Sequence, residues 1–101
     1  MEVVAGAGDF TSPGNAPNHY AEHLRTADLS LGTYSVPAGG LDDQSRHSED
    51  EVYVVTAGSA TLRAGGESAA VEPGSVIYVP AGEEHRFTDV SADLSLVVVF
   101  A

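Results

Sequence analysis

Short runs of β-branched and aromatic residues, divided by glycine, proline, aspartate and serine, follow one another from residue 21 to the end of the chain. Valine, isoleucine, threonine and tyrosine favour extended backbone, in which side chains alternate between two faces. No segment of useful length repeats its apolar residues with the helical period of about 3.6. The pattern therefore predicts an all-β fold.

Turn residues separate eight expected strands. Gly65-Gly66 between two of the runs predicts a tight hairpin. Short strands at hairpin spacing are typical of a barrel or jelly roll, in which closure of the sheet removes exposed edges. The expected strands are Ala21–Thr26, Leu29–Val36, Glu51–Ala57, Ala60–Ala64, Ser68–Val71, Val76–Val79, His85–Asp89 and Leu94–Phe100.

Length and charge restrict the function classes. The 101 residues are enough for one domain with one core. The net charge of −11 repels phosphate backbones and anionic membranes, so neither a nucleic-acid nor a membrane partner is expected. The chain has no cysteine, which excludes a disulfide framework, a thiolate metal site and a cysteine nucleophile.

The two ends of the chain suggest a location and a partner. The N-terminus lacks the features of a signal peptide, so we expect a cytoplasmic protein.

Residues 1–17 hold three glycines, two prolines and few large apolar side chains, and we expect an arm that is either loose or packed on a partner subunit. Residues 18–101 would form the barrel domain. The strand Leu94–Phe100 is apolar on both faces, which predicts a covering second subunit and hence a homodimer.

Two segments each place a histidine at the start of an expected strand. In the first, His47 is followed after three residues by Glu51 and, after six more, by Gly58. The second runs from Gly74 to Asp89, with glycines and a proline ahead of its histidine. Gly74 is followed after five residues by Pro80, after one more by Gly82, and after two more by His85.

Together these segments resemble the two motifs of the cupin superfamily in both spacing and order, and the resemblance covers most of the chain. It implies a single-domain cupin jelly-roll β-barrel, and it agrees with the homodimer because small cupins commonly dimerise through the sheet. Imidazole nitrogens and a carboxylate oxygen suit iron, manganese, nickel, copper or zinc. The expected ligands of such a divalent metal are His47, Glu51 and His85.

The first segment departs from the cupin pattern at one position. Most cupins have a further histidine two residues before His47, where this chain has Ser45. Gly39 keeps the glycine that opens the motif, and Asp42-Asp43-Gln44 resembles a set of small cupins in which a glutamine precedes the histidine. The amide oxygen of Gln44 is the candidate fourth ligand. Ser45, water or no ligand at that position are the alternatives.

Strand parity predicts which side chains surround the metal. Tyr53 must share the face of Glu51, and Phe87 and Asp89 must share the face of His85. A pocket between Tyr53, Phe87 and aliphatic side chains is then expected to open beside the metal.

Glu51 and Tyr53 are the candidate catalytic residues, the former as ligand and proton acceptor and the latter with plain packing as its alternative role. Two histidines and one carboxylate are the ligand set of non-haem iron oxygenases. The first hypothesis is therefore a metal-dependent, oxygenase-type enzyme acting on a small organic molecule. A non-oxidative isomerase or lyase and a non-catalytic binding or sensing module are the alternatives. Arg86 is expected to pair with a carboxylate near the rim, with a substrate anion as its alternative partner.

Overall fold

The computed structural model describes residues 1–101 and contains strands and turns but no helix. It confirms the all-β fold, and with no helix present the chain has no helical segment of the length and apolarity needed to cross a membrane. The strands are β1 (His19–Arg25), β2 (Ser30–Val36), β3 (Glu51–Ala64), β4 (Glu67–Val71), β5 (Val76–Val79) and β6 (His85–Phe100).

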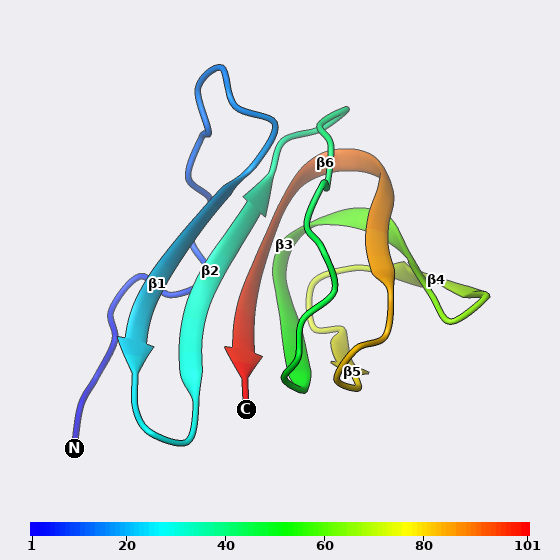
Figure 1. Ribbon diagram of the computed structural model, residues 1–101. Helices are drawn as coiled ribbons and strands as arrows, with labels where there is room; N and C mark the ends of the chain where they lie inside the picture. The colour runs from blue at the N-terminus through cyan, green and yellow to red at the C-terminus, as the bar shows by residue number, and fades with distance from the viewer.

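All strand pairs are antiparallel, in the order β1-β2-β6-β3-β4, with β5 paired to β3 beside its N-terminal half. The two long strands β3 and β6 pair from Glu51↔Phe100 to Ala64↔His85. Figure 1 shows them curving together out of the layer that contains β1 and β2 and towards β4. The sheet thus folds over on itself as in a cupin jelly roll, although β1 and β4 do not pair to close it.

Two of the expected strand breaks are bends within continuous strands, so the structure has six strands instead of eight. The pairing of β3 with β6 shifts register between Val55 and Thr61. At the centre of this region Gly58 has a φ of 84°, and a Cβ there would collide with the backbone carbonyl of Asp93. The glycine therefore allows the paired strands β3 and β6 to approach closely where they bend, and the chain does not reverse direction there.

Thirteen buried apolar residues form one core between the two layers. Alternation along the long strands supplies most of them, as for Leu62 and Phe87, which are cross-strand partners. Burial of a side chain of this size contributes about 1.5–3 kcal/mol. Each core residue therefore helps to keep β3 and β6 in the register that positions the two histidine segments.

The N-terminal arm lies against the sheet of its own chain, unlike the expected loose or partner-bound segment. The Gly8 amide donates to Thr33 Oγ1 at 2.9 Å. The Gly8 carbonyl accepts hydrogen bonds from Thr56 Oγ1 and Ser95 Oγ, each at 2.6 Å. Three strands therefore hold this part of the arm at one backbone position.

Beside the arm, the outer face of the same layer is apolar. Val97 and Val99 of β6 are half-buried, and their neighbour in the next strand but one, Tyr78, has 62 % of its surface exposed. On the inner face Leu94 and Leu96 are fully buried. The final strand is therefore apolar on both faces, as its sequence indicated. The predicted homodimer itself stays a prediction.

Candidate metal centre

Strand parity places the central side chains as predicted, with one exception. Glu51 and Tyr53 are 1 % and 0 % exposed, and His85 and Phe87 are 4 % and 2 % exposed, so both pairs point inward. Asp89 was expected on the same face, but its side chain is 72 % exposed. Its φ of 52° interrupts the alternation of β6, and this is why the expectation fails there.

The turn before β6 connects the two histidine segments through the backbone. Glu83 N donates to Pro80 O at 3.1 Å, and Gly82 has a φ of 76° at the third position of this turn. A positive φ at that position favours glycine. The Gly82 amide then donates to the carbonyl of His47 at 2.7 Å. This turn thus fixes the position of the loop that holds His47.

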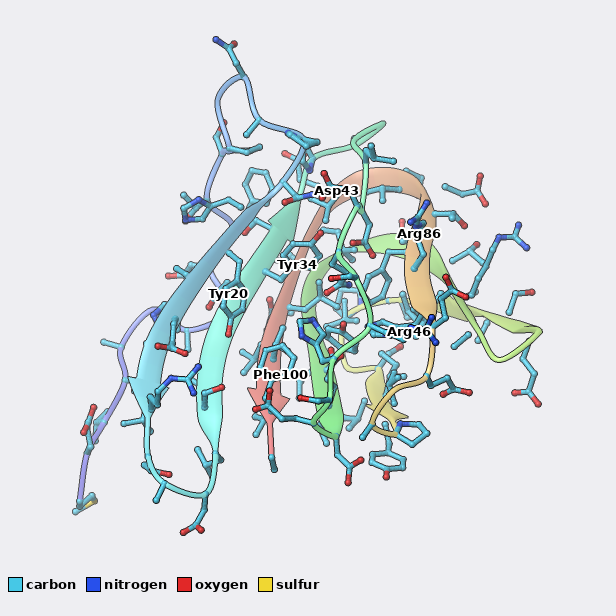
Figure 2. All side chains as sticks on the ribbon, viewed as in Figure 1. Tyr20, Tyr34, Asp43, Arg46, Arg86 and Phe100 are labelled. Atoms are coloured by element: carbon cyan, nitrogen blue, oxygen red, sulfur yellow. The ribbon has the colours of Figure 1, made fainter.

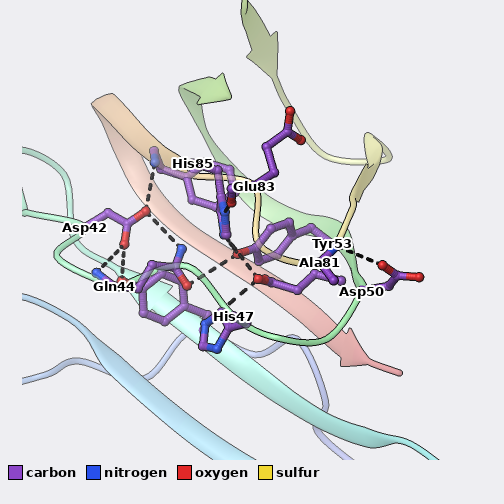
Figure 3. Close-up of polar contacts among 11 residues, drawn as sticks. Asp42, Gln44, His47, Asp50, Tyr53, Ala81, Glu83 and His85 are labelled. Atoms are coloured by element: carbon purple, nitrogen blue, oxygen red, sulfur yellow. Dashed lines mark hydrogen bonds and ion pairs between the residues drawn. The ribbon is translucent and has the colours of Figure 1, made fainter. Parts of the chain in front are cut away.

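His85, Tyr53 and Glu51 form a buried polar cluster, in which the His85 ring points towards the Tyr53 hydroxyl (Figure 3). His85 Nδ1 donates to the carbonyl of Glu83 at 2.9 Å, which directs Nε2 inward. Nε2 lies 2.9 Å from Tyr53 Oη and 3.3 Å from Glu51 Oε1. The protonated ring donates from Nε2 to the Glu51 carboxylate, whereas in the neutral ring Nε2 can instead accept from the tyrosine hydroxyl. The second carboxylate oxygen of Glu51, Oε2, is buried and has no hydrogen-bond partner.

The environment of this cluster shifts three pKa values. Burial alone would raise the pKa of Glu51, but hydrogen bonds from His85 and Tyr53 outweigh it and lower that pKa. Burial alone would lower the pKa of His85, but its hydrogen bond to the Glu51 carboxylate outweighs this and raises it. Burial and the adjacent carboxylate raise the pKa of Tyr53 far above its usual value. Tyr53 therefore remains a proton donor in the metal-free protein.

The other two predicted ligands lie next to this cluster, on the loop of residues 37–50. His47 Nε2 is 3.9 Å from Glu51 Oε1, and its ring lies 4.7 Å from that of Phe100. Gln44 Oε1 accepts a long hydrogen bond of 3.4 Å from the Tyr53 hydroxyl. The structure thus brings all four candidate ligands into one region. Ser45 is exposed and makes no such contact.

Asp42 is a site residue that the sequence analysis did not single out. Its carboxylate is 1 % exposed and accepts hydrogen bonds from the Tyr34 hydroxyl and the Phe87 amide, both at 2.8 Å. It also accepts from the backbone and side-chain amides of Gln44 at 3.2 and 3.1 Å. The side-chain bond turns the Gln44 oxygen towards Tyr53. A lone aspartate in an acidic loop gives no sequence signal for this role.

The cluster fits a transition metal in its chemistry and partly in its spacing. Two ligands bound at about 2.1 Å to one ion lie roughly 3.0–3.4 Å apart. The 3.3 Å between His85 Nε2 and Glu51 Oε1 agrees with this spacing, and the unpartnered Oε2 is a further free donor. His47 is more distant at 3.9 Å, and no group of three or more His, Cys, Asp or Glu side chains converges as a metal site. The three-residue metal site therefore stays a prediction.

An open pocket of about 370 Å³ lies beside His47, as expected, but other side chains surround it. Tyr53 and Phe87 belong to the core, where their rings pack edge to face at 5.2 Å, so the expected composition of the wall is wrong. We call this cavity the aromatic pocket. Its lining includes Asn18, Tyr20, Tyr34, Gln44, His47 and Phe100.

Comparison with known proteins agrees with this architecture. Residues 32–100 match the family model of the cupin domain. This chain belongs to the cupin family. It is also 45 % identical over 82 residues to the uncharacterized protein SCO3923 of Streptomyces coelicolor, a match that covers 81 % of this chain and 78 % of that protein.

Solved structures show the same fold at low sequence identity. The DMSP lyase DddQ from Ruegeria pomeroyi superposes with a TM-score of 0.77 and 19 % identity. The match covers 82 % of this chain but only 46 % of the lyase, so this chain spans less than half of that protein. A predicted oxalate decarboxylase from Thermotoga maritima gives a TM-score of 0.70 and 19 % identity, covering 80 % of this chain and 76 % of that one. These likenesses concern the fold alone.

Proposed function

We propose that this cupin is a metal-dependent enzyme that transfers a proton to or from a small organic molecule, in the manner of a lyase or an isomerase. The observation behind the proposal is the buried contact of Tyr53 Oη with His85 Nε2 at 2.9 Å, beside the Glu51 carboxylate. A protonated phenol beside a carboxylate supplies a proton donor and a proton acceptor, the two groups that general acid–base catalysis requires.

In this proposal His47, Glu51 and His85 hold one divalent transition metal, with Gln44 as the candidate fourth ligand. The unpartnered Oε2 of Glu51 supports the assignment, because an orphaned carboxylate oxygen in a dry interior is costly. The Nδ1 bond of His85 to a backbone carbonyl is the second interaction that metal-binding histidines commonly make. When bound, such a metal would polarise an oxygen of the substrate as a Lewis acid.

The remaining residues supply orientation and protons. The raised pKa of Tyr53 keeps its hydroxyl protonated, so Tyr53 is placed to donate a proton. The Glu51 carboxylate, through the oxygen that does not bind the metal, is the adjacent group that takes a proton up or returns it. Asp42 fixes Gln44 through its amide, and Gln44 in turn contacts Tyr53 Oη at 3.4 Å. The tyrosine is therefore held by two neighbours in one orientation.

The aromatic pocket is the proposed entrance for the substrate. Tyr20 and Phe100 pack edge to face, with ring centres 6.2 Å apart, and offer an apolar surface. Asn18 and Gln44 add neutral polar groups to the lining, and His47 connects it with the cluster. Charged side chains complete the lining, namely Glu22, Arg25, Asp43 and Glu49. A volume of about 370 Å³ suits a small organic molecule.

An oxygenase-type reaction is the second candidate, favoured by the set of two histidines and one carboxylate in neighbouring positions. The structural likeness to a DMSP lyase and a predicted oxalate decarboxylase shows that this fold accommodates reactions other than oxygenation, without assigning one here. Oxygen consumption separates the two candidates. Turnover that requires dioxygen would contradict the proton-transfer proposal.

The proposal is tested with Tyr53→Phe in a protein loaded with metal and assayed against small carbonyl compounds and organic acids. Tyr78→Phe is the matched control, because it removes the same hydroxyl from an exposed residue. We expect both variants to keep the metal, and only Tyr53→Phe to lose turnover, by at least about 100-fold. Undiminished turnover in Tyr53→Phe would contradict the proposal. So would saturable ligand binding with no turnover in the wild-type protein, which would indicate a binding or sensing module.

We also propose that two copies pair through the apolar outer face of β3, β5 and β6. The half-buried Val54 lies between Val97 and the exposed Val76 in one cross-strand row of this face. A stable dimer would bury on the order of 1,000 Å² or more there. Light scattering is expected to give a dimer for the wild-type protein and a monomer for Val54→Asp. A monomeric wild-type protein at micromolar concentration would contradict this.

A further inference from the structure

Three of the four arginines of the chain line one open hollow of about 850 Å³. Arg46 comes from the loop of residues 37–50, Arg63 from the end of β3 and Arg86 from the start of β6. Figure 2 shows Arg46 and Arg86 on the same side of the molecule, away from Tyr20 and Phe100. Because the chain has no lysine and a net charge of −11, this arginine hollow concentrates most of its positive charge.

Two of these arginines are placed directly opposite each other. Arg63 and Arg86 are cross-strand partners in the antiparallel pair of β3 and β6. Their neighbours Leu62 and Phe87 are buried in the core. Because side chains alternate between the two faces of a sheet, Arg63 and Arg86 project from the opposite, outer face. Like charges at opposed positions of a sheet destabilise it. An anion between or above the two side chains would relieve this repulsion.

The chain itself supplies little of that charge. Arg63 donates to the hydroxyl of Thr88 at 3.2 Å and has only a distant carboxylate, Asp89, at 3.9 Å between exposed groups. Arg46 and Arg86 form no ion pair at all, so the expected pairing of Arg86 with a rim carboxylate is absent.

The fourth arginine, by contrast, forms a close ion pair. Arg25, outside the hollow, donates to one oxygen of Glu22 through Nε at 3.0 Å and Nη2 at 2.6 Å. The hollow also contains the carboxylates of Asp43, Glu67 and Glu84, none of which lies within ion-pair distance of an arginine. Because three carboxylates offset the three arginines, the hollow has no excess positive charge, which disfavours a polyanion and leaves direct pairing of a small anion with one or two guanidinium groups.

We propose that the arginine hollow binds the carboxylate groups of a small organic anion, with Arg46 and Arg86 as its main ligands and Arg63 as a weaker one. Guanidinium groups match a carboxylate through two parallel hydrogen bonds, which makes this pairing both strong and selective. The site lies on the other side of Asp43 and Gln44 from the aromatic pocket, since these two residues line both cavities. It does not depend on a bound metal.

The test is calorimetric titration of the metal-free protein with malonate, phosphate and chloride at constant ionic strength. We expect one saturable malonate site per chain and weaker binding of phosphate and chloride. Arg86→Gln is expected to weaken malonate binding at least about tenfold. Arg25→Gln removes the same charge from an arginine that already has a partner, and it is expected to leave the affinity unchanged. Using metal-free protein keeps this result separate from any failure of the metal proposal.

A second measurement checks the same residue without relying on affinity. Because Arg86 opposes Arg63, Arg86→Gln is expected to raise the Tm of the ligand-free protein while abolishing the Tm increase that malonate causes in the wild type. Absence of saturable malonate binding by the wild type would overturn the proposal. Tighter binding of phosphate than of malonate, or equal losses in Arg25→Gln and Arg86→Gln, would overturn it as well.

Discussion

The buried cluster and the arginine hollow adjoin each other at Gln44 and His85, and they differ in how their charged groups are partnered. Around Tyr53, Glu51 and His85 nearly every polar atom has a partner from the chain, and Glu51 Oε2 is the exception. In the hollow, Arg46 and Arg86 have no ion-pair partner although both are exposed. The cluster is buried and held by hydrogen bonds before any ligand binds. The hollow is exposed to solvent, and two of its arginines lack an ion-pair partner.

The two regions therefore differ in when their ligand-binding groups become ordered. A buried donor set is fixed by hydrogen bonds made during folding, as with Asp42, which holds Gln44 before any ligand arrives. The exposed arginines gain most of their hydrogen bonds only when an anion arrives, and the mutual repulsion of Arg63 and Arg86 is relieved at that moment. The two regions should therefore respond differently to mutation, pH and salt.

The largest effect is expected from Asp42→Ala. The change leaves the Tyr34 hydroxyl and the Phe87 amide buried without an acceptor, which should lower the free energy of unfolding by about 3 kcal/mol. Urea denaturation measures it. Asp43→Ala is the control, because its carboxylate makes only an exposed hydrogen bond to Asn18 and should cost less than about 1 kcal/mol. Equal losses in the two variants would show that Asp42 does not organise the site.

A smaller change is expected when acid competes with the metal in the buried cluster. Metal binding needs a neutral imidazole at His85. Burial alone would lower the pKa of this imidazole, but its hydrogen bond to the Glu51 carboxylate outweighs this and raises the pKa. Lowering the pH from about 7 to about 5 should therefore weaken metal binding by at least about 25-fold, because a single histidine with the ordinary pKa of about 6.5 gives that loss and a raised pKa increases it. Equilibrium dialysis at each pH measures the affinity. An affinity that does not change with pH would exclude the His85 imidazole as a ligand.

The smallest expected effect is the different salt dependence of ligand affinity in the two regions. Raising sodium chloride from about 0.05 to about 0.5 M screens exposed charges much more than buried ones. Malonate affinity in the arginine hollow should fall several-fold, whereas metal affinity in the cluster should change by less than about twofold. Calorimetry of both ligands in the same buffers makes the comparison. The opposite ranking would mean that the two regions have been assigned the wrong electrostatic character.

Much of the fold and the inward direction of the site could be predicted from the sequence. The spacing of His47, Glu51 and His85 with their glycines identified the cupin motifs, and strand parity placed Tyr53 and Phe87 inward. These predictions succeed because spacing along a strand determines the face of each side chain.

Long-range register was not accessible in the same way. The closeness of Arg63 to Arg86 and of Tyr20 to Phe100 depends on how β3, β2 and β1 align with β6. The sequence predicted a turn at Gly58, because glycine is favoured both where a strand bends and where the chain reverses direction. The buried role of Asp42 depends on four donors from three residues, of which Tyr34 and Phe87 lie on different strands.

The central claim is that Glu51 anchors a metal in the buried cluster, and metal stoichiometry tests it most directly. Metal-free wild-type protein and Glu51→Gln would each be titrated with Mn²⁺ and Zn²⁺, with Glu72→Gln as the exposed control. We predict one ion per chain for the wild type and for Glu72→Gln, and none for Glu51→Gln while its thermal unfolding remains cooperative. A wild-type protein that binds no ion, or a Glu51→Gln variant that binds as tightly as the wild type, would contradict the claim.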